Sequence, residues 1–354
     1  MRAIVYAETG APDVLKFSER PEPEPGDGEV LVRVAVSGVN PTDWKARRGD
    51  GSGRRLAFPE VVPNQDGAGT VVAVGTNVDP ARVGQRVWMW EAAWERANGT
   101  AQELMALPGS QAVPMPDDAS FDLGASLGIP ALTAHRCLTV GAEGPAALGP
   151  RTLDGVKVLV AGGSGAVGHA AIELALWSGA TIIATVSSPE KAELAEAAGA
   201  HHVVNYRAED AALAIRRAAP DGIDVIVEVA AATNAALDAS VIGPNGTVAI
   251  YASDPEDVTI RAGSAMRGNT RYQFILVYTV SPQVKRQAVR DVQAAVAAGA
   301  LRVGEEAGLP LHRFPLERTA DAHAAVESGA VGKVLIDVER PASSMSSPLG
   351  PASV

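Results

Sequence analysis

Val158-Leu-Val-Ala-Gly-Gly-Ser-Gly-Ala-Val-Gly168 is the stretch that decides the fold of this 354-residue chain. Its first four residues form an apolar run typical of a buried parallel strand, and residues 170–178 continue in a helical pattern. Between them the glycines have the spacing Gly-x-Gly-x-x-Gly. Glycines in this arrangement let the backbone approach a pyrophosphate, and the N–H groups at the start of the helix face the anion. The sequence therefore predicts a dinucleotide-binding turn.

The cofactor of this turn is predicted from the end of the next strand, 180–186. An NAD site usually carries Asp or Glu there, about 20 residues past the glycines, to bind the ribose 2′-hydroxyl. Ser187 and Ser188 occupy that place, and Lys191 follows. Two hydroxyls and a lysine suit a 2′-phosphate, so the sequence favours NADPH. In the alternative interpretation, the serines only cap the helix 190–198 and Lys191 is solvated.

Composition limits the class of protein. The length of 354 residues predicts two domains, since single cores rarely exceed about 250–300 residues. The formal charge of −11 argues against a nucleic-acid or anionic-membrane partner. The sequence has no apolar run long enough to cross a bilayer and no pattern of a secretory leader, so we expect a cytoplasmic protein. The single cysteine, Cys137, excludes an internal disulfide framework and is expected in the core.

The order of elements changes part-way along the chain. The first third is rich in strands and punctuated by glycines, whereas strand–helix repeats follow from residue 156. We expect helices over 120–126, 129–139 and 281–298, and a last sheet strand over 271–279. The fold class is thus α/β, with a Rossmann parallel-sheet domain inserted in a β-rich domain built from both chain ends. The predicted boundaries are 1–126 and 281–340 for the β-rich domain, 127–280 for the Rossmann domain and 341–354 for a disordered tail.

Short motifs along the chain have the order and spacing of a known superfamily. They are Gly38-Val-Asn-Pro41, Asp66-Gly-Ala-Gly69, Gly84-x-Arg-Val87, Ile129-Pro-Ala-Leu-Thr-Ala134, the glycine turn, Gly199-Ala200 and Gly332-Lys333. With them the chain resembles the medium-chain dehydrogenase/reductase superfamily, and within it the zinc-free NADPH:quinone oxidoreductase branch that includes ζ-crystallin. The resemblance covers roughly residues 1–340 and implies that the β-rich domain is a GroES-like catalytic domain.

The resemblance also implies roles for individual residues. Ser187, Lys191 and Tyr206 would hold the 2′-phosphate of NADPH, whereas Asn40 and Thr133 would lie beside the nicotinamide as catalytic-site residues. Simpler interpretations stay open: Asn40 as a turn residue before a proline, Thr133 bonded to its own helix, and Tyr206 as a surface residue. The predicted cofactor-binding set also includes the glycine turn and five residues further along the chain. The turn residues are Gly163, Ser164, Gly165, Ala166, Val167 and Gly168, and the others are Tyr251, Ser253, Leu276, Val277 and Lys333.

Residues that bind zinc elsewhere in the superfamily are missing from this sequence. Zinc alcohol dehydrogenases carry Cys where Asn40 stands, His near Gln65, and a lobe with four cysteines. Amide side chains are poor substitutes for thiolate and imidazole at zinc. The six histidines lack metal-ligand spacing. We therefore expect no metal.

The expected reaction is transfer of a hydride from NADPH to a quinone or a related conjugated carbonyl. A quinone needs little acid catalysis, which suits a sequence without an obvious acid–base pair. The alternative is an NADPH-dependent alkenal or enone (enoyl) reductase, in which the enolate carbon must be protonated. Lys45 is the candidate proton donor, although a solvated loop lysine fits the same position. A non-catalytic NADPH-binding structural or sensory protein is a further alternative.

The expected partners are a small-molecule substrate and a second copy of the chain. The apolar stretch 274–278 is the expected last strand of the sheet. An exposed edge of that kind invites pairing with a second copy, so we predict a homodimer.

Overall fold

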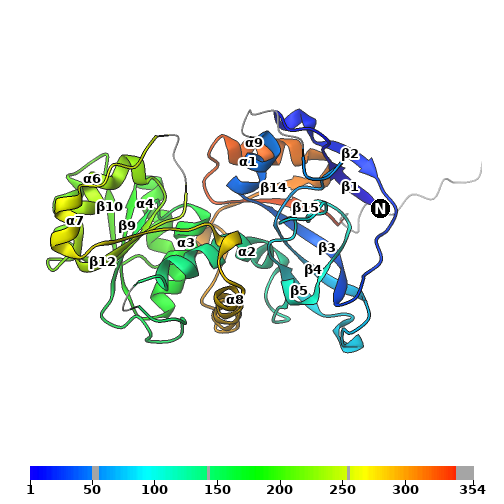
Figure 1. Cartoon of the computed structure of the whole chain (residues 1–354), viewed down its shortest axis with the longest axis horizontal. Coiled ribbons are helices and arrows are strands. Elements are labelled where there is room, and N and C mark those ends of the chain that lie inside the picture. The colour runs from blue at the N-terminus through cyan, green and yellow to red at the C-terminus, as the bar shows by residue number, and fades with distance from the viewer. Residues whose placement is uncertain (50–55, 142–143, 253–255, 340–354) are drawn as a thin grey trace, which may run out of the picture.

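The computed structural model describes residues 1–49, 56–141, 144–252 and 256–339. It consists of two lobes built on two sheets (Figure 1). One lobe holds a six-stranded parallel sheet, and the other holds a seven-stranded sheet beside a two-stranded ribbon. Helix α2 (Phe121–Leu138) lies between the lobes and packs against elements of both. This helix is therefore a main contact between the two halves of the molecule.

The parallel sheet has the strand order β10-β9-β8-β11-β12-β13. From the central strand β8 the chain moves to β9 and β10 on one side, and then returns to β11, β12 and β13 on the other. Such a reversal creates a ligand crevice at the carboxyl ends of the central strands. The strands are β8 (Lys157–Ala161), β9 (Thr181–Val186), β10 (His202–Asn205), β11 (Ile223–Glu228), β12 (Ile242–Ile250) and β13 (Arg271–Phe274), and the helices are α3 (Ala166–Trp177), α4 (Pro189–Ala197), α5 (Ala211–Ala218), α6 (Ala231–Val241) and α7 (Ala262–Gly268).

The seven-stranded sheet has the order β14-β15-β3-β4-β5-β7, and β6 also pairs with β3. β15 is antiparallel to β3, with Val334 opposite Val39. One sheet thus combines strands from both ends of the chain. Its strands and the ribbon are β1 (Arg2–Val5), β2 (Lys16–Glu19), β3 (Glu29–Val39), β4 (Asp66–Val74), β5 (Arg86–Met89), β6 (Leu104–Pro108), β7 (Ala112–Pro114), β14 (Leu311–Pro315) and β15 (Lys333–Asp337), and the further helices are α1 (Pro41–Arg48), α8 (Pro282–Ala297) and α9 (Thr319–Glu327).

The predicted fold class is confirmed, since a parallel Rossmann sheet is inserted between the two parts of a β-rich domain. The domain boundaries at 126, 280 and 340 stay predictions. The predicted tail 341–354 lies outside the described residues. Within the described ranges, no helix is both long and apolar enough to cross a bilayer.

The expectation of two helices, over 120–126 and 129–139, is wrong. α2 continues through Pro130, although an internal proline removes an N–H donor and usually ends a helix. The preceding N–H, that of Ile129, donates to the carboxylate of Asp66 at 2.9 Å. Gly128 makes room for this carboxylate, because a Cβ at that position would lie 2.0 Å from Asp66 Oδ1. A contact from the β-rich lobe thus supports the helix where its own hydrogen bonding is interrupted.

The expected last strand, 271–279, is too long. β13 ends at Phe274, and Val277–Thr279 form a short 3₁₀ turn. The strand ends because its partner does: Ile250, opposite Phe274, is the last residue of β12. The edge of the sheet is therefore the four-residue strand β13 rather than the stretch 274–278.

A buried polar contact fixes α8 to α2. His135 Nε2 lies 2.7 Å from Asp291 Oδ2, to which the backbone N–H of Leu148 also donates (2.8 Å). Gln287 Nε2 donates to the other carboxylate oxygen at 2.7 Å. Burial acts to raise the pKa of Asp291, but these hydrogen bonds outweigh it and hold the pKa below its usual value. The ionised carboxylate therefore stabilises the contact between α2 and α8.

Asp291→Asn is expected to lower the free energy of unfolding by about 2 kcal/mol near neutral pH, because hydrogen bonds to a charged acceptor are lost. The pKa of Asp291 is lower in the folded than in the unfolded chain, so its contribution is complete above the unfolded value of about 3.9. It is lost as the pH falls through the folded value. Urea denaturation of both proteins over a pH series measures the difference, and a difference that does not shrink toward acid pH would contradict the ionised pair.

Candidate functional site

The glycine turn between β8 and α3 has the geometry of a cradle for a dinucleotide. A Cβ on Gly168 would lie 2.4 Å from the carbonyl oxygen of Gly162, and one on Gly163 would lie 2.9 Å from Ala184 Cβ. These two glycines therefore permit close packing of strand and helix. Gly165 is the N-cap of α3, and a Cβ there would meet no atom closer than 3.5 Å. Open space at the start of α3, beside free N–H groups, fits the pyrophosphate of a dinucleotide.

Three residues predicted to hold a 2′-phosphate come together at the carboxyl ends of β9 and β10. Lys191 Nζ donates to Ser187 Oγ at 3.1 Å. The N–H of Tyr206 donates to the carbonyl of Val186 at 3.1 Å, and the Tyr206 side chain is 50 % exposed. Ser188 accepts from the N–H of Lys191 at 3.4 Å and caps α4. Of the two serines that the alternative interpretation assigns to helix capping, Ser188 caps the helix, whereas Ser187 accepts a hydrogen bond from Lys191.

The residues predicted to flank the nicotinamide follow the neighbouring strands of the same sheet edge. Tyr251 comes directly after β12, and its N–H donates to the carbonyl of Glu228 at 3.1 Å. Leu276 and Val277 follow β13; Leu276 is half-exposed, and Val277 is buried. Ser253 lies outside the described residues. Because carboxyl ends of parallel strands share one edge, these residues face the same crevice end of the sheet as the glycine turn.

Asn40 lies at the centre of a buried network in the β-rich lobe. It is the N-cap of α1 and is 2 % exposed. Its Nδ2 donates to Asp66 Oδ2 at 2.7 Å, and its Oδ1 accepts from Lys333 Nζ at 2.7 Å. Its backbone N–H donates to Asp43 Oδ2 at 2.7 Å. The side-chain amide is therefore held in one orientation, with one N–H left for a ligand.

The charges of this network are enclosed by protein. Lys333 Nζ lies 3.6 Å from Asp66 Oδ2, and both side chains are almost completely buried. Burial raises the pKa of Asp66 and lowers the pKa of Lys333, and the opposite charge of each partner partly offsets this. Burial and the nearby Asp66 also raise the pKa of Asp43. A compensated pair of buried charges is thus located beside Asn40.

Lys333 is predicted to contact the cofactor, but its ammonium group binds Asn40 and Asp66. The preceding residue, Gly332, forms a β-bridge with Gly165 of the glycine turn. The segment before β15 therefore touches the cofactor cradle through its backbone, while the lysine side chain orients Asn40. Direct contact between Lys333 and a cofactor stays a prediction.

The other two predicted catalytic residues, Thr133 and Lys45, make no hydrogen bond to the Asn40 network within the described residues. Thr133 is 5 % exposed on α2, and its hydroxyl makes no hydrogen bond within the described residues, whereas Ser126 on the same helix donates to the carbonyl of Asp122 at 2.7 Å. Lys45 is on the exposed side of α1, with its Nζ 5.9 Å from the centre of the Trp44 ring, and this ammonium group has no hydrogen-bond partner within the described part of the chain. Thr133 therefore has a free hydroxyl, and Lys45 is not part of the Asn40 network.

An aromatic group near this network is missing from the sequence predictions. The rings of Trp94 and Tyr278 stack with centroids 4.4 Å apart, and Tyr278 Oη donates to Thr42 Oγ1 at 3.2 Å. Lys285 Nζ donates to Glu91 Oε2 at 2.7 Å and to the carbonyl of Tyr278 at 2.6 Å. The available signal was the pair of tryptophans at 90 and 94, in a chain with only five.

Comparison with known proteins defines the family. Residues 26–117 match the alcohol dehydrogenase GroES-like domain, and residues 166–294 match the family described as zinc-binding dehydrogenase. Quinone oxidoreductase of Rattus norvegicus is 31 % identical over 342 residues, which cover 95 % of this chain and 97 % of the rat protein. The chain belongs to the quinone oxidoreductase branch of the medium-chain dehydrogenase/reductase superfamily. It is an oxidoreductase.

Solved structures agree with this quinone oxidoreductase fold. A mycobacterial protein solved with NADPH superposes with a TM-score of 0.78 at 28 % identity, covering 95 % of this chain and 99 % of the mycobacterial chain. An NAD-dependent alcohol dehydrogenase superposes with a TM-score of 0.81 at 26 % identity, covering 96 % and 100 %. Similar folds thus accompany both nicotinamide cofactors, so the choice between them depends on the residues at the end of β9.

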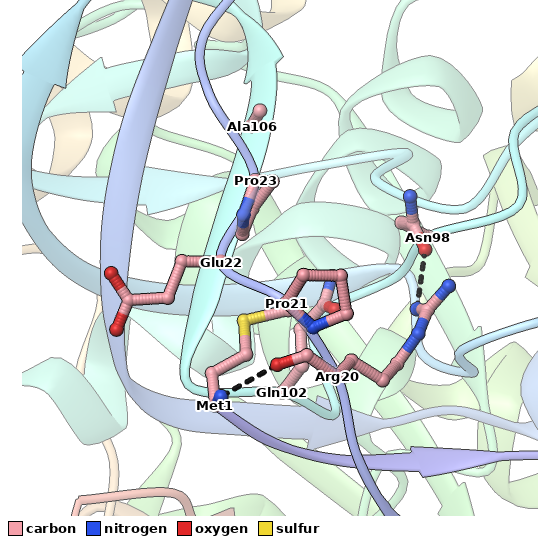
Figure 2. Close-up of a pocket in the computed structure, with 8 residues that line it drawn as sticks. All are labelled: Met1, Arg20, Pro21, Glu22, Pro23, Asn98, Gln102 and Ala106. Carbon is pink, nitrogen blue, oxygen red and sulfur yellow. Dashed lines mark hydrogen bonds between the residues drawn. The ribbon is translucent and has the colours of Figure 1, made fainter.

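A surface pocket near the start of the chain lies apart from the predicted site (Figure 2). There the N-terminal ammonium group donates to the carbonyl of Arg20 at 2.7 Å, and Arg20 donates to Asn98 Oδ1 at 2.8 Å. None of the predicted site residues lines this pocket.

Within the described ranges, no group of three or more His, Cys, Asp or Glu side chains is placed to hold a metal ion.

Lys333→Met is expected to lower the free energy of unfolding by about 3–5 kcal/mol, because it leaves the buried Asp66 carboxylate uncompensated. Adding Asp66→Asn to this variant removes the unpaired charge and is expected to restore part of the loss. Urea denaturation of the two single variants and the double variant measures the coupling. Simple addition of the two single losses would contradict a direct interaction between these charges.

Proposed function

We propose that this protein is a zinc-independent, NADPH-dependent oxidoreductase that transfers a hydride to quinones or related conjugated carbonyls. The observation that carries the proposal is the Ser187–Lys191 contact beside Tyr206 at the end of β9. An ammonium group and hydroxyls bind a phosphate, whereas an NAD site carries an acidic residue at this place. The mycobacterial relative solved with NADPH, at 28 % identity, supports the same cofactor. The rat quinone oxidoreductase supports the substrate class.

In this proposal, the cofactor supplies the hydride, and the protein supplies position and electrostatics. The N–H groups at the start of α3 bind the pyrophosphate, for which Gly165 leaves space. Lys191 and Ser187 bind the 2′-phosphate. Asn40, held by Asp66 and Lys333, orients the reacting groups through its remaining N–H. Thr133 offers a hydroxyl from α2 that has no hydrogen-bond partner among the described residues.

The zinc independence of the proposed reaction is supported by the chemistry of the Asn40 network. An amide replaces the thiolate that zinc prefers. The amide oxygen of Asn40 already accepts from the Lys333 ammonium group at 2.7 Å. A divalent cation bound there would lie beside this positive charge, which disfavours it by electrostatic repulsion.

The alternative function, reduction of alkenals or enones, is supported by neutral hydroxyl groups near the Asn40 network. This reaction needs a proton donor for the enolate carbon. Thr133 and Thr42, whose hydroxyl oxygen accepts from Tyr278, are candidates. Burial raises the pKa of Tyr278 and makes its phenol a weaker acid, so in this alternative Tyr278 orients the Thr42 hydroxyl and does not itself give up a proton. Among the described residues, the ammonium group of Lys45, the first candidate donor, makes no hydrogen bond to these groups, so Lys45 is the weaker choice.

We also propose a homodimer, formed through the edge of the parallel sheet. β13 is the last strand of that sheet, and Phe274, at its end, is 59 % exposed. An exposed edge strand with a large apolar side chain favours pairing with a second copy. The cytoplasm is the proposed location, on the grounds of the sequence alone.

Sedimentation velocity at micromolar concentration is expected to show a dimer. Phe274→Glu is expected to shift the protein toward monomer, because it places a charge on the apolar edge. Exposed Met266→Glu, on α7, is the matched control and is expected to leave the dimer unchanged. A monomer in all three proteins would contradict the proposal.

NADPH oxidation with 1,4-benzoquinone, 9,10-phenanthrenequinone and an α,β-unsaturated ketone tests the proposed function. We expect turnover of the quinones with NADPH in preference to NADH. Lys191→Ala is expected to raise the KM for NADPH about ten-fold and to leave the KM for NADH unchanged, because only the 2′-phosphate contact is lost.

The outcomes of this assay distinguish the alternatives. Turnover of the ketone alone favours the enone reductase. Tight binding of NADPH without turnover of any compound favours a structural or sensory protein. A preference for NADH would show that the assignment of Ser187 and Lys191 is wrong. Glu193→Ala, a change on α4 beyond the phosphate contact, serves as the control for general effects on that helix.

A further inference from the structure

The aromatic group of Trp94 and Tyr278 joins three distant segments of the chain. Trp94 belongs to the loop after β5, Tyr278 follows β13, and Thr42 is in the first turn of α1. The stacked rings are inclined by only 17°. Tyr278 is 6 % exposed, whereas Trp94 is half-buried. Trp94 therefore covers Tyr278 on one face and keeps accessible aromatic surface of its own.

The loop that carries Trp94 is held in an unusual backbone conformation. Glu91 and Glu95, on either side of the ring, have φ angles of 49° and 55°, a region that non-glycine residues rarely adopt. Arg96 donates to the carbonyl of Glu91 at 2.7 Å, and Lys285 binds the Glu91 carboxylate and the carbonyl of Tyr278. Strained residues persist where the surrounding structure fixes them, and they cluster at ligand sites. The position of Trp94 is therefore imposed by the fold rather than by local preference.

The location of this group is next to the proposed reaction site. Thr42 lies two residues after Asn40, and Tyr278 lies directly after Val277, one of the residues predicted to flank the nicotinamide. The hydrogen bond between Tyr278 and Thr42 thus connects the two sides of the proposed site. A quinone ring that receives a hydride lies with one face on the nicotinamide, so its other face is free to stack on a planar side chain.

We propose that Trp94, backed by Tyr278, is a stacking platform that selects flat, fused-ring substrates over acyclic ones. The inference rests on the proposed function and adds a specificity-determining residue to it. Aromatic stacking favours offset, nearly parallel rings, and an electron-poor quinone ring stacks well on an electron-rich indole. Glu91 and Lys285 are positioning residues, which act by holding the loop and Tyr278 in place.

Trp94→Leu and Trp94→Phe test the platform. With 9,10-phenanthrenequinone, Trp94→Leu is expected to raise the KM about three- to ten-fold with little change in kcat, which corresponds to the loss of one stacking contact. With the acyclic enal trans-2-hexenal the KM is expected to stay the same. Trp94→Phe keeps a ring and is expected to restore most of the affinity for the quinone.

A binding measurement separates this proposal from the proposed function. Equilibrium binding of 9,10-phenanthrenequinone, with NADP⁺ present, is expected to weaken in Trp94→Leu by the same factor, whether or not the wild type reduces quinones. Trp177→Leu, at the far end of α3 from the glycine turn, is the matched control. Equal effects on fused-ring and acyclic compounds, or no effect of Trp94→Leu on quinone binding, would overturn the platform. A wild type that binds the quinone through Trp94 without reducing it would overturn only the proposed function.

Discussion

The buried ammonium group of Lys333 is the constraint on which the β-rich lobe depends. An isolated charge in the protein interior is very unfavourable, so a lysine that is 1 % exposed requires partners. Asn40 and Asp66 provide them from the starts of α1 and β4. Asp66 also accepts from Ile129 of α2. β15 must therefore pair with β3, next to β4 in the same sheet, and α2 must pack against this sheet before the charge is compensated.

This network also fixes the direction of the Asn40 amide dipole at the proposed site. Rotation of the Asn40 amide would turn its NH₂ group toward an ammonium group and its oxygen toward a carboxylate, so the observed orientation is fixed. A fixed dipole needs no reorganisation when charge develops during a reaction. For the proposed hydride transfer, such a dipole beside a compensated buried charge supplies electrostatic stabilisation from the protein's own side chains.

The sequence predicts those parts of the structure that local contacts decide. The strand, turn and helix around Gly163 follow from adjacent residues, and Lys191 meets Ser187 because they are four residues apart at the start of one helix. The errors occur where a distant segment decides. Pro130 does not end α2, because Asp66 supports the helix from another lobe, and β13 stops where β12 gives it no further partner.

The Trp94–Tyr278 group depends most strongly on contacts between distant segments. Thr42, Trp94 and Tyr278 are separated by about fifty and by more than one hundred and eighty residues, and one sequence contains no sign that they meet. The cofactor cradle is a local motif, whereas the proposed substrate surface is assembled from separate loops. Loops that converge on a site vary more freely than the elements that carry them. At 31 % identity over nearly the whole chain, the oxidoreductase family is shared, whereas the proposed substrate surface depends on side chains that these separate loops supply.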